Sequence, residues 1–239
     1  MERNYHSMFA HVINYLSIAP YLYRYENQNF IDNFFDSGEL LISSFQEYKK
    51  YTDNQLGDKS EGSTMNIANI ANDKSMITYT TTGFNDYCFC TSTVLEKELI
   101  KTFKRNSVFR IKDPINFVLE ITRVLPRVME VLYGHCIYLE RKIIKKTLPN
   151  LQFEDFQNKD KDIELEKVMA VSNEIQGPDA YFIKERIFQR HSEFRIIWRT
   201  DRKVESPIKI ICPEAIKYCE KIQLDEISDY DIPTIKQVN

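Results

Sequence analysis

Short runs of apolar residues alternate with polar positions along most of the chain, the pattern of β-strands that have one buried face. β-Branched and aromatic residues, which strands favour, dominate these runs. The segments between them take on helical spacing irregularly, without the regular alternation of strand and helix that builds a parallel sheet. No glycine-rich turn of the Rossmann type follows any run. We predict strands at residues 21–26, 39–44, 76–82, 86–92, 107–111, 130–140, 192–200 and 208–212.

This pattern predicts a single α+β domain over residues 1–239, with mixed, mostly antiparallel sheets and flanking helices. Helical apolar spacing near the start, ended by Pro20, predicts an N-terminal helix over residues 1–19. An Asp-Pro pair, with aspartate as cap and proline in the first turn, predicts another helix over residues 113–124. Residues 141–175 carry alternating charges with weak amphipathic periodicity, and we expect a charged helical insertion there.

Composition adds limits to this picture. The chain is 43% hydrophobic and 28% charged with a formal net charge of −3, which indicates a globular protein and excludes a uniformly basic nucleic-acid coat. It contains no apolar run of about 18 residues, so no transmembrane helix or membrane contact is predicted. The five cysteines are odd in number and scattered, as in a protein with reduced thiols. We therefore expect a cytoplasmic protein.

Two polar groups interrupt the early apolar strands. Arg24 lies within a strand-like aromatic run, where a charge is costly unless it meets an anion, either an internal carboxylate or a ligand phosphate. Ser43 and Ser44 end the next predicted strand, where their hydroxyls can bond a ligand or cap the following turn. Glu47, three residues after Ser44, would complete a capping box and favours the second alternative.

A third polar group lies in the late strand. Glu193 and Arg195 are two residues apart, so a strand projects both side chains from one face. They can form a cross-strand ion-pair ladder, or Glu193 can be a functional carboxylate held on a rigid strand beside a neighbouring arginine. The sequence leaves these two readings open.

Metal binding is the weakest of the candidate chemistries. Asp58 and Glu61 lie beside glycines in a polar stretch that can bind a divalent cation, although a solvated loop is the better interpretation. Cys88 and Cys90 flank one residue, whereas zinc knuckles normally have two residues between their cysteines. No metal is expected.

The order of segments resembles a broad family of uncharacterised bacterial proteins, a domain of unknown function with an aromatic-basic first strand and a late strand with a glutamate two residues before an arginine. The resemblance covers most of residues 20–200. It rests on the segments LYRYE, SGELLISSFQEYKKYTDNQLGDKSEG, YCFCTS, SVFRIKDPINFVLEI, YGHCIYLE and FIKERIFQRHSEFRIIW.

The layout also looks like the ADP-ribosyltransferase fold, in which successive strands carry a basic residue, a serine or tyrosine, and a glutamate. The resemblance implies that the substrate NAD binds here and that Glu193 stabilises the cation-like transition state at the ribose. It implies that Arg24 holds the NAD diphosphate and that Ser43 or Ser44 orders the sheet around the nicotinamide. The remaining residues that it implies for NAD binding are Tyr23 and Tyr25, which would stack on the ring, and Arg195.

Three function hypotheses follow. The first is an ADP-ribosyltransferase or NAD glycohydrolase, which the resemblance suggests is a bacterial toxin or anti-phage effector with a nucleic-acid or protein acceptor and a possible antitoxin or regulatory partner. The second is a non-catalytic protein-binding module, and the third is a metal-dependent nuclease that uses Asp58, Glu61 and Glu193. A nucleic-acid acceptor would meet the basic residues Arg105, Arg110, Arg123, Arg127, Arg141, Lys142, Lys145 and Lys146.

Overall fold

A computed structural model describes residues 5–7, 21–50 and 58–227, in which the chain forms two compact units. The first unit takes its described residues from 1–59, 83–136 and 187–239. The second takes them from 60–82 and 137–186. Each unit has its own strands and its own apolar core. The single α+β domain over residues 1–239 stays a prediction.

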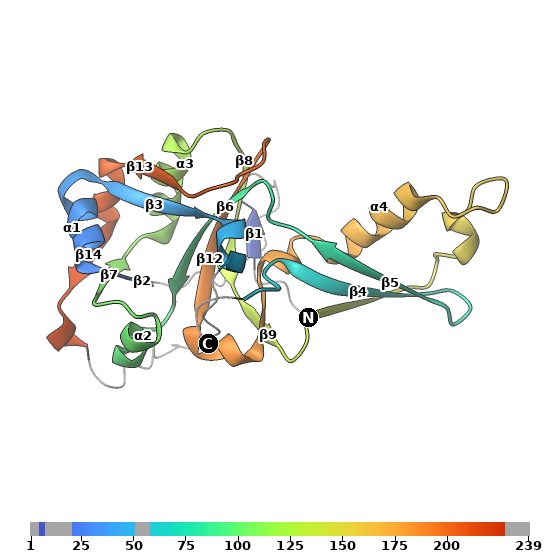
Figure 1. Cartoon of the computed structure of the whole chain (residues 1–239), viewed down its shortest axis with the longest axis horizontal. Helices are drawn as coiled ribbons and strands as arrows, with labels where there is room; N and C mark the ends of the chain where they lie inside the picture. The colour runs from blue at the N-terminus through green and yellow to red at the C-terminus, as the bar shows by residue number, and fades with distance from the viewer. Residues whose placement is uncertain (1–4, 8–20, 51–57, 228–239) are drawn as a thin grey trace, which may run out of the picture. The chain divides into compact units, whose positions relative to one another are not determined.

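One nine-stranded antiparallel sheet forms the first unit (Figure 1). Its strands are β1 (Tyr5–Ser7), β2 (Leu22–Glu26), β3 (Glu39–Ser44), β6 (Asp86–Ser92), β7 (Ser107–Ile111), β8 (Val128–His135), β12 (Glu193–Thr200), β13 (Ile208–Ile211) and β14 (Cys219–Ile222). The main path runs β1–β8–β12–β6–β2–β7–β14. β3 also pairs with β6 and carries β13 on its other side, so the sheet branches at β6.

The first unit contains three α-helices and several 3₁₀ turns among its described residues. They are α1 (Gln28–Ser37), α2 (Lys97–Thr102), α3 (Pro114–Val124) and the 3₁₀ turns η1 (Phe45–Lys50), η4 (Arg186–His191, from Ile187 onward), η5 (Pro213–Tyr218) and η6 (Leu224–Glu226). The carboxylate of Asp113 accepts a hydrogen bond from the Asn116 amide at 3.1 Å and caps α3. α1 ends at Gly38, whose φ of 78° and closeness to the Pro213 backbone leave no room for a side chain.

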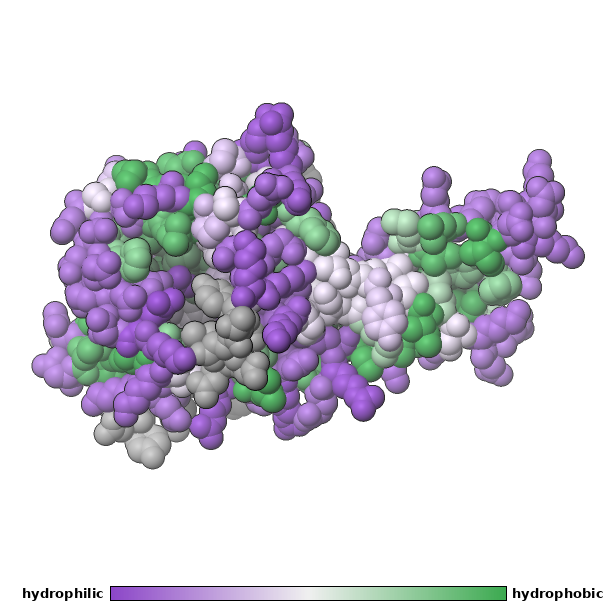
Figure 2. All heavy atoms as spheres, in the orientation of Figure 1, coloured by the Kyte–Doolittle hydropathy of each residue, from purple (hydrophilic) through white to green (hydrophobic). Residues whose placement is uncertain are grey.

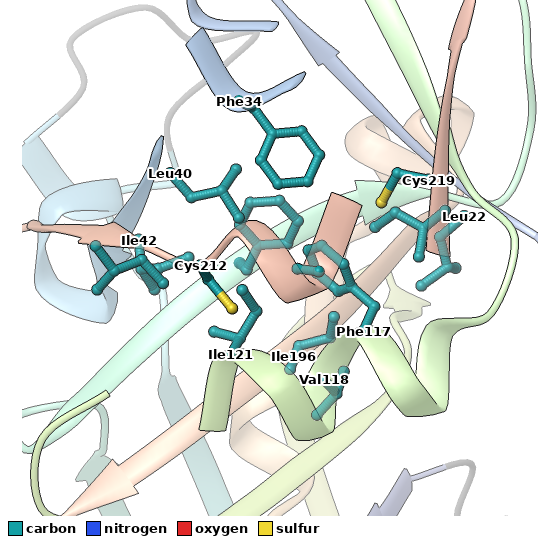
Figure 3. Packing of buried hydrophobic residues seen from close by; sticks show 14 of the residues in the cluster. Leu22, Phe34, Leu40, Ile42, Phe117, Val118, Ile121, Ile196, Cys212 and Cys219 are labelled. Carbon is teal, nitrogen blue, oxygen red and sulfur yellow. The ribbon is translucent and has the colours of Figure 1, made fainter. Parts of the chain in front are cut away.

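The main core of this unit lies on the sheet face covered by α1 and α3 (Figure 3). Phe34 of α1 and Phe117 of α3 are fully buried there with Phe89 of β6, and the rings of Phe89 and Phe117 lie 5.8 Å apart between centroids. Trp198 of β12 is also fully buried, and its indole N–H donates to the Thr122 hydroxyl at 2.8 Å. Packing and this hydrogen bond hold β12 in place against α3.

The second unit combines small sheets with one longer helix. Its elements are β4 (Ser63–Ile70), β5 (Ser75–Thr81), β9 (Ile137–Leu139), β10 (Ile143–Leu148), η2 (Phe153–Phe156), α4 (Leu165–Gln176), η3 (Asp179–Tyr181) and β11 (Ile183–Glu185). β4 and β5 form an antiparallel hairpin, β10 joins β4 in parallel, and β9 and β11 form a separate parallel pair. The core includes Ala68, Ile70, Ile144, Phe156 and Ile175.

The predicted α+β class with mostly antiparallel sheets is confirmed, and so is the helix expected over residues 113–124. Two helix predictions need correction. Tyr5–Ser7 is a strand paired with β8, and the rest of the predicted helix over residues 1–19 lies outside the described residues. The charged segment 141–175 contains α4 but starts with β10, because its isoleucines gain burial and backbone pairing beside β4.

Candidate functional site

β6 brings the predicted site residues together, because strands that carry them pair with both of its edges (Figure 1). β12 pairs along one edge, with Glu193 opposite Ser92. β2 and β3 share the other edge, with Tyr23 opposite Ser92 and Ser43 opposite Cys88. The branch in the sheet therefore places the early strands within one strand of the late glutamate.

The register continues this alignment into a row of side chains that crosses four strands. Glu193 lies opposite Ser92, Ser92 opposite Tyr23, and Tyr23 opposite Arg110 of β7. Directly opposed residues of antiparallel strands project from the same face of a sheet. Since neighbouring strands lie about 4.8 Å apart, the three intervals from Glu193 to Arg110 span about 14 Å. We call Glu193, Ser92, Tyr23 and Arg110 the transverse row.

Glu193 forms a buried ion pair on this face. Arg195 Nε donates to Glu193 Oε1 at 2.6 Å, and the two side chains are only 2% and 8% exposed, respectively. The guanidinium carbon also lies 5.7 Å from the centroid of the Phe45 ring, which packs so closely on Gly83 that a side chain there would collide with it. The pair lies within one strand rather than across strands. It holds a carboxylate rigidly in surroundings of low dielectric constant.

Two thiols and a phenol lie near this ion pair. The sulfur atoms of Cys88 and Cys90 are 3.5 Å apart. Burial raises the pKa of the Cys88 thiol above its ordinary value, and burial likewise raises the pKa of the Tyr48 hydroxyl. A protonated thiol is a poor nucleophile, so burial makes Cys88 unsuited to that role.

Arg24 occupies a different place from the one that the resemblance implied. Its guanidinium donates to the Cys90 carbonyl at 2.7 Å and to the Glu26 carboxylate at 2.9 Å, and lies 4.7 Å from the Phe89 ring centroid. The pleat of β2 projects this side chain from the face opposite to that of Glu193. Arg24 is therefore paired with an internal carboxylate, that of Glu26, the first of the two alternatives that the sequence left open.

The two serines differ in their surroundings. Ser44 is fully buried, and its hydroxyl accepts a hydrogen bond from the Glu47 amide at 3.2 Å, the capping arrangement that the sequence favoured. Ser43 lies directly opposite Cys88 and so projects from the same face as the transverse row. Of the two, Ser43 is the one whose position suits contact with a ligand.

The two tyrosines of β2 also separate. Tyr25 is 6% exposed, and its hydroxyl donates to the Val94 carbonyl at 2.9 Å and accepts from the Glu96 amide at 2.8 Å. Its ring packs against Phe103 at 5.4 Å between centroids, which makes Tyr25 an anchor of the α2 segment. Tyr23 is only half-buried and stays within the transverse row.

Arg110 and Ser92 are the residues of the transverse row that were not predicted as site residues from the sequence, and Arg110 was treated only as one of several basic residues. Its guanidinium carbon lies 5.2 Å from the Tyr21 ring centroid and 5.6 Å from that of Tyr23. One nitrogen donates to Glu220 at 2.5 Å, whereas the buried Nε has no hydrogen-bond partner in the described structure. The side chain is 31% exposed. The available signal was a charge within the apolar run SVFRI, on the face opposite to that of Phe109, which belongs to the main core.

The acidic stretch expected to be a solvated loop is instead buried. Asp58 is 5% exposed and Glu61 is 1% exposed. Glu61 lies 4.0 Å from the Lys184 ammonium, which compensates its charge within the second unit. Among residues 5–7, 21–50 and 58–227, no group of three or more His, Cys, Asp or Glu side chains is placed to hold a metal ion.

The basic cluster from Arg141 to Lys146 does not form the helix face that we expected, because residues 143–148 are a strand. Lys142 is buried and donates to the Ser60 carbonyl at 3.0 Å, whereas Lys145 is exposed. The alternating directions of a strand separate these charges, so they do not make one continuous cationic surface.

Comparisons with known proteins give no relative from which a function can be carried over. No protein-family model matches the chain, and neither a curated protein nor a solved structure does. Within the part of the chain that the structure describes, no helix has the length and apolar character needed to cross a membrane.

Proposed function

We propose that this protein binds NAD on the face that carries the transverse row and cleaves the bond between nicotinamide and ribose, as an ADP-ribosyltransferase or NAD glycohydrolase. The observation that carries the proposal is the register that aligns Glu193, Ser92, Tyr23 and Arg110 on one face. This face offers a carboxylate, an aromatic ring and a cation within about 14 Å. Those are the groups that a ribosyl cation, a diphosphate and a nicotinamide ring require.

Glu193 is the proposed catalytic residue. When the bond from ribose C1′ to the nicotinamide nitrogen breaks, its electron pair leaves with nicotinamide and positive charge develops on the ribose. A fixed carboxylate in a site of low dielectric constant stabilises that charge more than it stabilises the substrate. An acceptor oxygen or nitrogen, or water in a glycohydrolase, then bonds to C1′ and releases its proton.

Arg110 and Tyr23 are the proposed binding residues, and Arg110 takes the diphosphate role first expected of Arg24. A guanidinium binds phosphate oxygens with parallel hydrogen bonds, and the buried Nε of Arg110 is a donor without a partner in the described structure. The half-buried Tyr23 ring lies between Arg110 and Ser92, where it can stack on the nicotinamide. Because the Glu193 side chain is only 8% exposed, binding has to displace side chains that cover it.

The proposal extends to a bacterial toxin or anti-phage effector that modifies a nucleic acid or a protein. Incubation of purified protein with NAD, followed by chromatography of the nicotinamide released, tests its first step. We expect turnover by the wild type and a loss of about 10²–10³-fold in Glu193→Gln. Binding of NAD should persist in that variant, because the groups assigned to the diphosphate and the ring are unchanged.

Two further variants separate a catalytic role from a structural one. Glu193→Gln/Arg195→Met replaces the whole buried pair by neutral groups and should fold while staying inactive. Glu130→Gln, which alters an exposed ion pair with Arg199 on the same sheet, should retain full turnover. Turnover by the folded double variant, or none by the wild type with nucleic-acid and protein acceptors supplied, would contradict the proposal.

A further inference from the structure

β5 is an edge strand of the second unit, and its sequence SMITYTT has no charge, proline or glycine. In the sheet order β10–β4–β5, β4 is the strand paired with it in the described structure. Natural proteins usually protect such an edge with lysine, proline or a bulge, because its free backbone groups can pair with another strand. None of the seven residues of β5 is a lysine or a proline, although 28% of the residues in the chain are charged.

The pairing with β4 determines which backbone groups of β5 face outward. Thr82 donates to the Gly62 carbonyl at 3.0 Å and Ile70 donates to the Lys74 carbonyl at 2.9 Å, so these are hydrogen-bonded pairs. Such pairs alternate along an antiparallel ladder. Even-numbered residues of β5 therefore bond to β4, whereas the N–H and C=O groups of Ser75, Ile77, Tyr79 and Thr81 point away from it.

Two of these outward-facing residues, Ile77 and Tyr79, also have exposed apolar side chains. Tyr79 is 79% exposed and Ile77 is 58% exposed. They lie opposite Met65 and Ile67 of β4, which are half-buried, so the apolar surface extends over two strands. Over β4 and β5, Figure 2 shows hydrophobic residues among paler ones of intermediate hydropathy. α4 covers the other face of the sheet, where the Thr78 and Ser172 hydroxyls lie 2.6 Å apart.

We propose that β5 pairs with β5 of a second copy of this chain, so that two three-stranded sheets join into one antiparallel sheet across a two-fold axis at Thr78. This register pairs all seven residues and uses all the outward-facing backbone groups, because residues 75 and 77 meet residues 81 and 79 of the second copy. It also places each Ile77 opposite a Tyr79, which gives two apolar cross-strand pairs on the exposed face.

Charge supports a second copy as the occupant. A partner strand rich in positive or negative side chains would gain no electrostatic attraction from the neutral edge of β5. Two identical neutral strands, by contrast, meet without like-charge repulsion. Lys74, directly before β5, lies beyond the paired region and is 3.9 Å from Glu154 of its own chain. The two copies of Lys74 would lie at opposite ends of the paired strands.

Light scattering after size-exclusion chromatography, over a series of concentrations, tests this pairing in the full chain. We expect wild-type protein to have twice the mass of one chain, and Ile77→Lys/Tyr79→Lys to have the mass of one chain because lysines then oppose lysines. Leu165→Lys is the matched control, because Leu165 is 67% exposed on α4 of the same unit. It should remain dimeric.

A charge swap tests the register. Ile77→Glu/Tyr79→Glu should also be monomeric alone, but an equimolar mixture with the double-lysine variant should restore the dimer. Amide hydrogen exchange of Ile77 and Tyr79 should be slow in the wild type and fast in each double variant. A monomeric wild type at all concentrations, or a double-lysine variant that stays dimeric, overturns the proposal.

Discussion

Removal of one partner from the Glu193–Arg195 ion pair is expected to destabilise the first unit strongly. The two groups lie 2.6 Å apart and keep only 8% and 2% of their side chains exposed. Arg195→Met leaves the Glu193 carboxylate without its guanidinium in a site where water cannot replace it. Breaking a buried pair in this way costs about 3–5 kcal/mol of unfolding free energy.

The same strand provides a control. Arg199 of β12 lies 2.6 Å from Glu130, but these side chains are 48% and 31% exposed. Solvent screens such a pair, so Glu130→Gln should cost less than about 1 kcal/mol. Glu193→Gln/Arg195→Met should recover most of the stability lost in Arg195→Met, because no buried charge of this pair remains uncompensated.

Urea denaturation followed by tryptophan fluorescence measures these differences. Trp198 is the only tryptophan in the chain, is fully buried and lies three residues from Arg195 on β12. Its emission therefore reports on the strand that carries the ion pair. The reasoning fails if Arg195→Met costs no more than Glu130→Gln, or if the double variant loses more stability than Arg195→Met.

Other expectations concern the core, the helix cap and alkaline pH. Phe117→Ala should cost about 3–5 kcal/mol, since Phe117 is fully buried. Leu119→Ala, at a residue 36% exposed on the same helix, should cost much less in the same urea assay. Asp113→Ala should lower stability by about 1 kcal/mol through loss of the α3 cap, and a cost near zero would contradict that role. Burial raises the pKa of Cys88 and of Tyr48 in the folded chain above the unfolded pKa values of 9.0 and 10.0. The stability that these two groups contribute is therefore present below those unfolded pKa values and is lost as the pH rises above them. A melting temperature that falls above pH 9 in the wild type and falls less in Tyr48→Phe would agree with this sign; an unchanged dependence would not.

Much of the sheet could be predicted because period-two apolar patterns survive in strands with one buried face. The runs that became β2, β3, β6, β7, β12 and β13 were all recognised, since their buried residues alternate or are continuously apolar. β4 was missed because Ser63–Ile70 buries Thr64 and Asn66, whose hydrogen bonds with Thr80 satisfy them. β10 was predicted to be helical because its two adjacent isoleucines are followed by two lysines, a spacing that fits either period.

Only part of the candidate site could be predicted from the sequence. Glu193 and Arg195 could be identified because two charges at strand spacing in an apolar run need a reason. The roles of Arg24 and Arg110 depend on which face each strand presents and on how strands far apart in the sequence pair, which local patterns do not contain. The register is the reason why we propose Arg110 rather than Arg24 for the phosphate contact.

Calorimetric titration of the purified chain with NAD tests the central claim most directly. The account predicts saturable binding by the wild type and weakening of at least about tenfold in Arg110→Met, from the loss of hydrogen bonds to a charged group. Arg105→Met is the matched control, because Arg105 is also about one-third exposed and paired with a glutamate, Glu26, but lies outside the transverse row. No binding by the wild type, or equal weakening in both variants, would contradict the account.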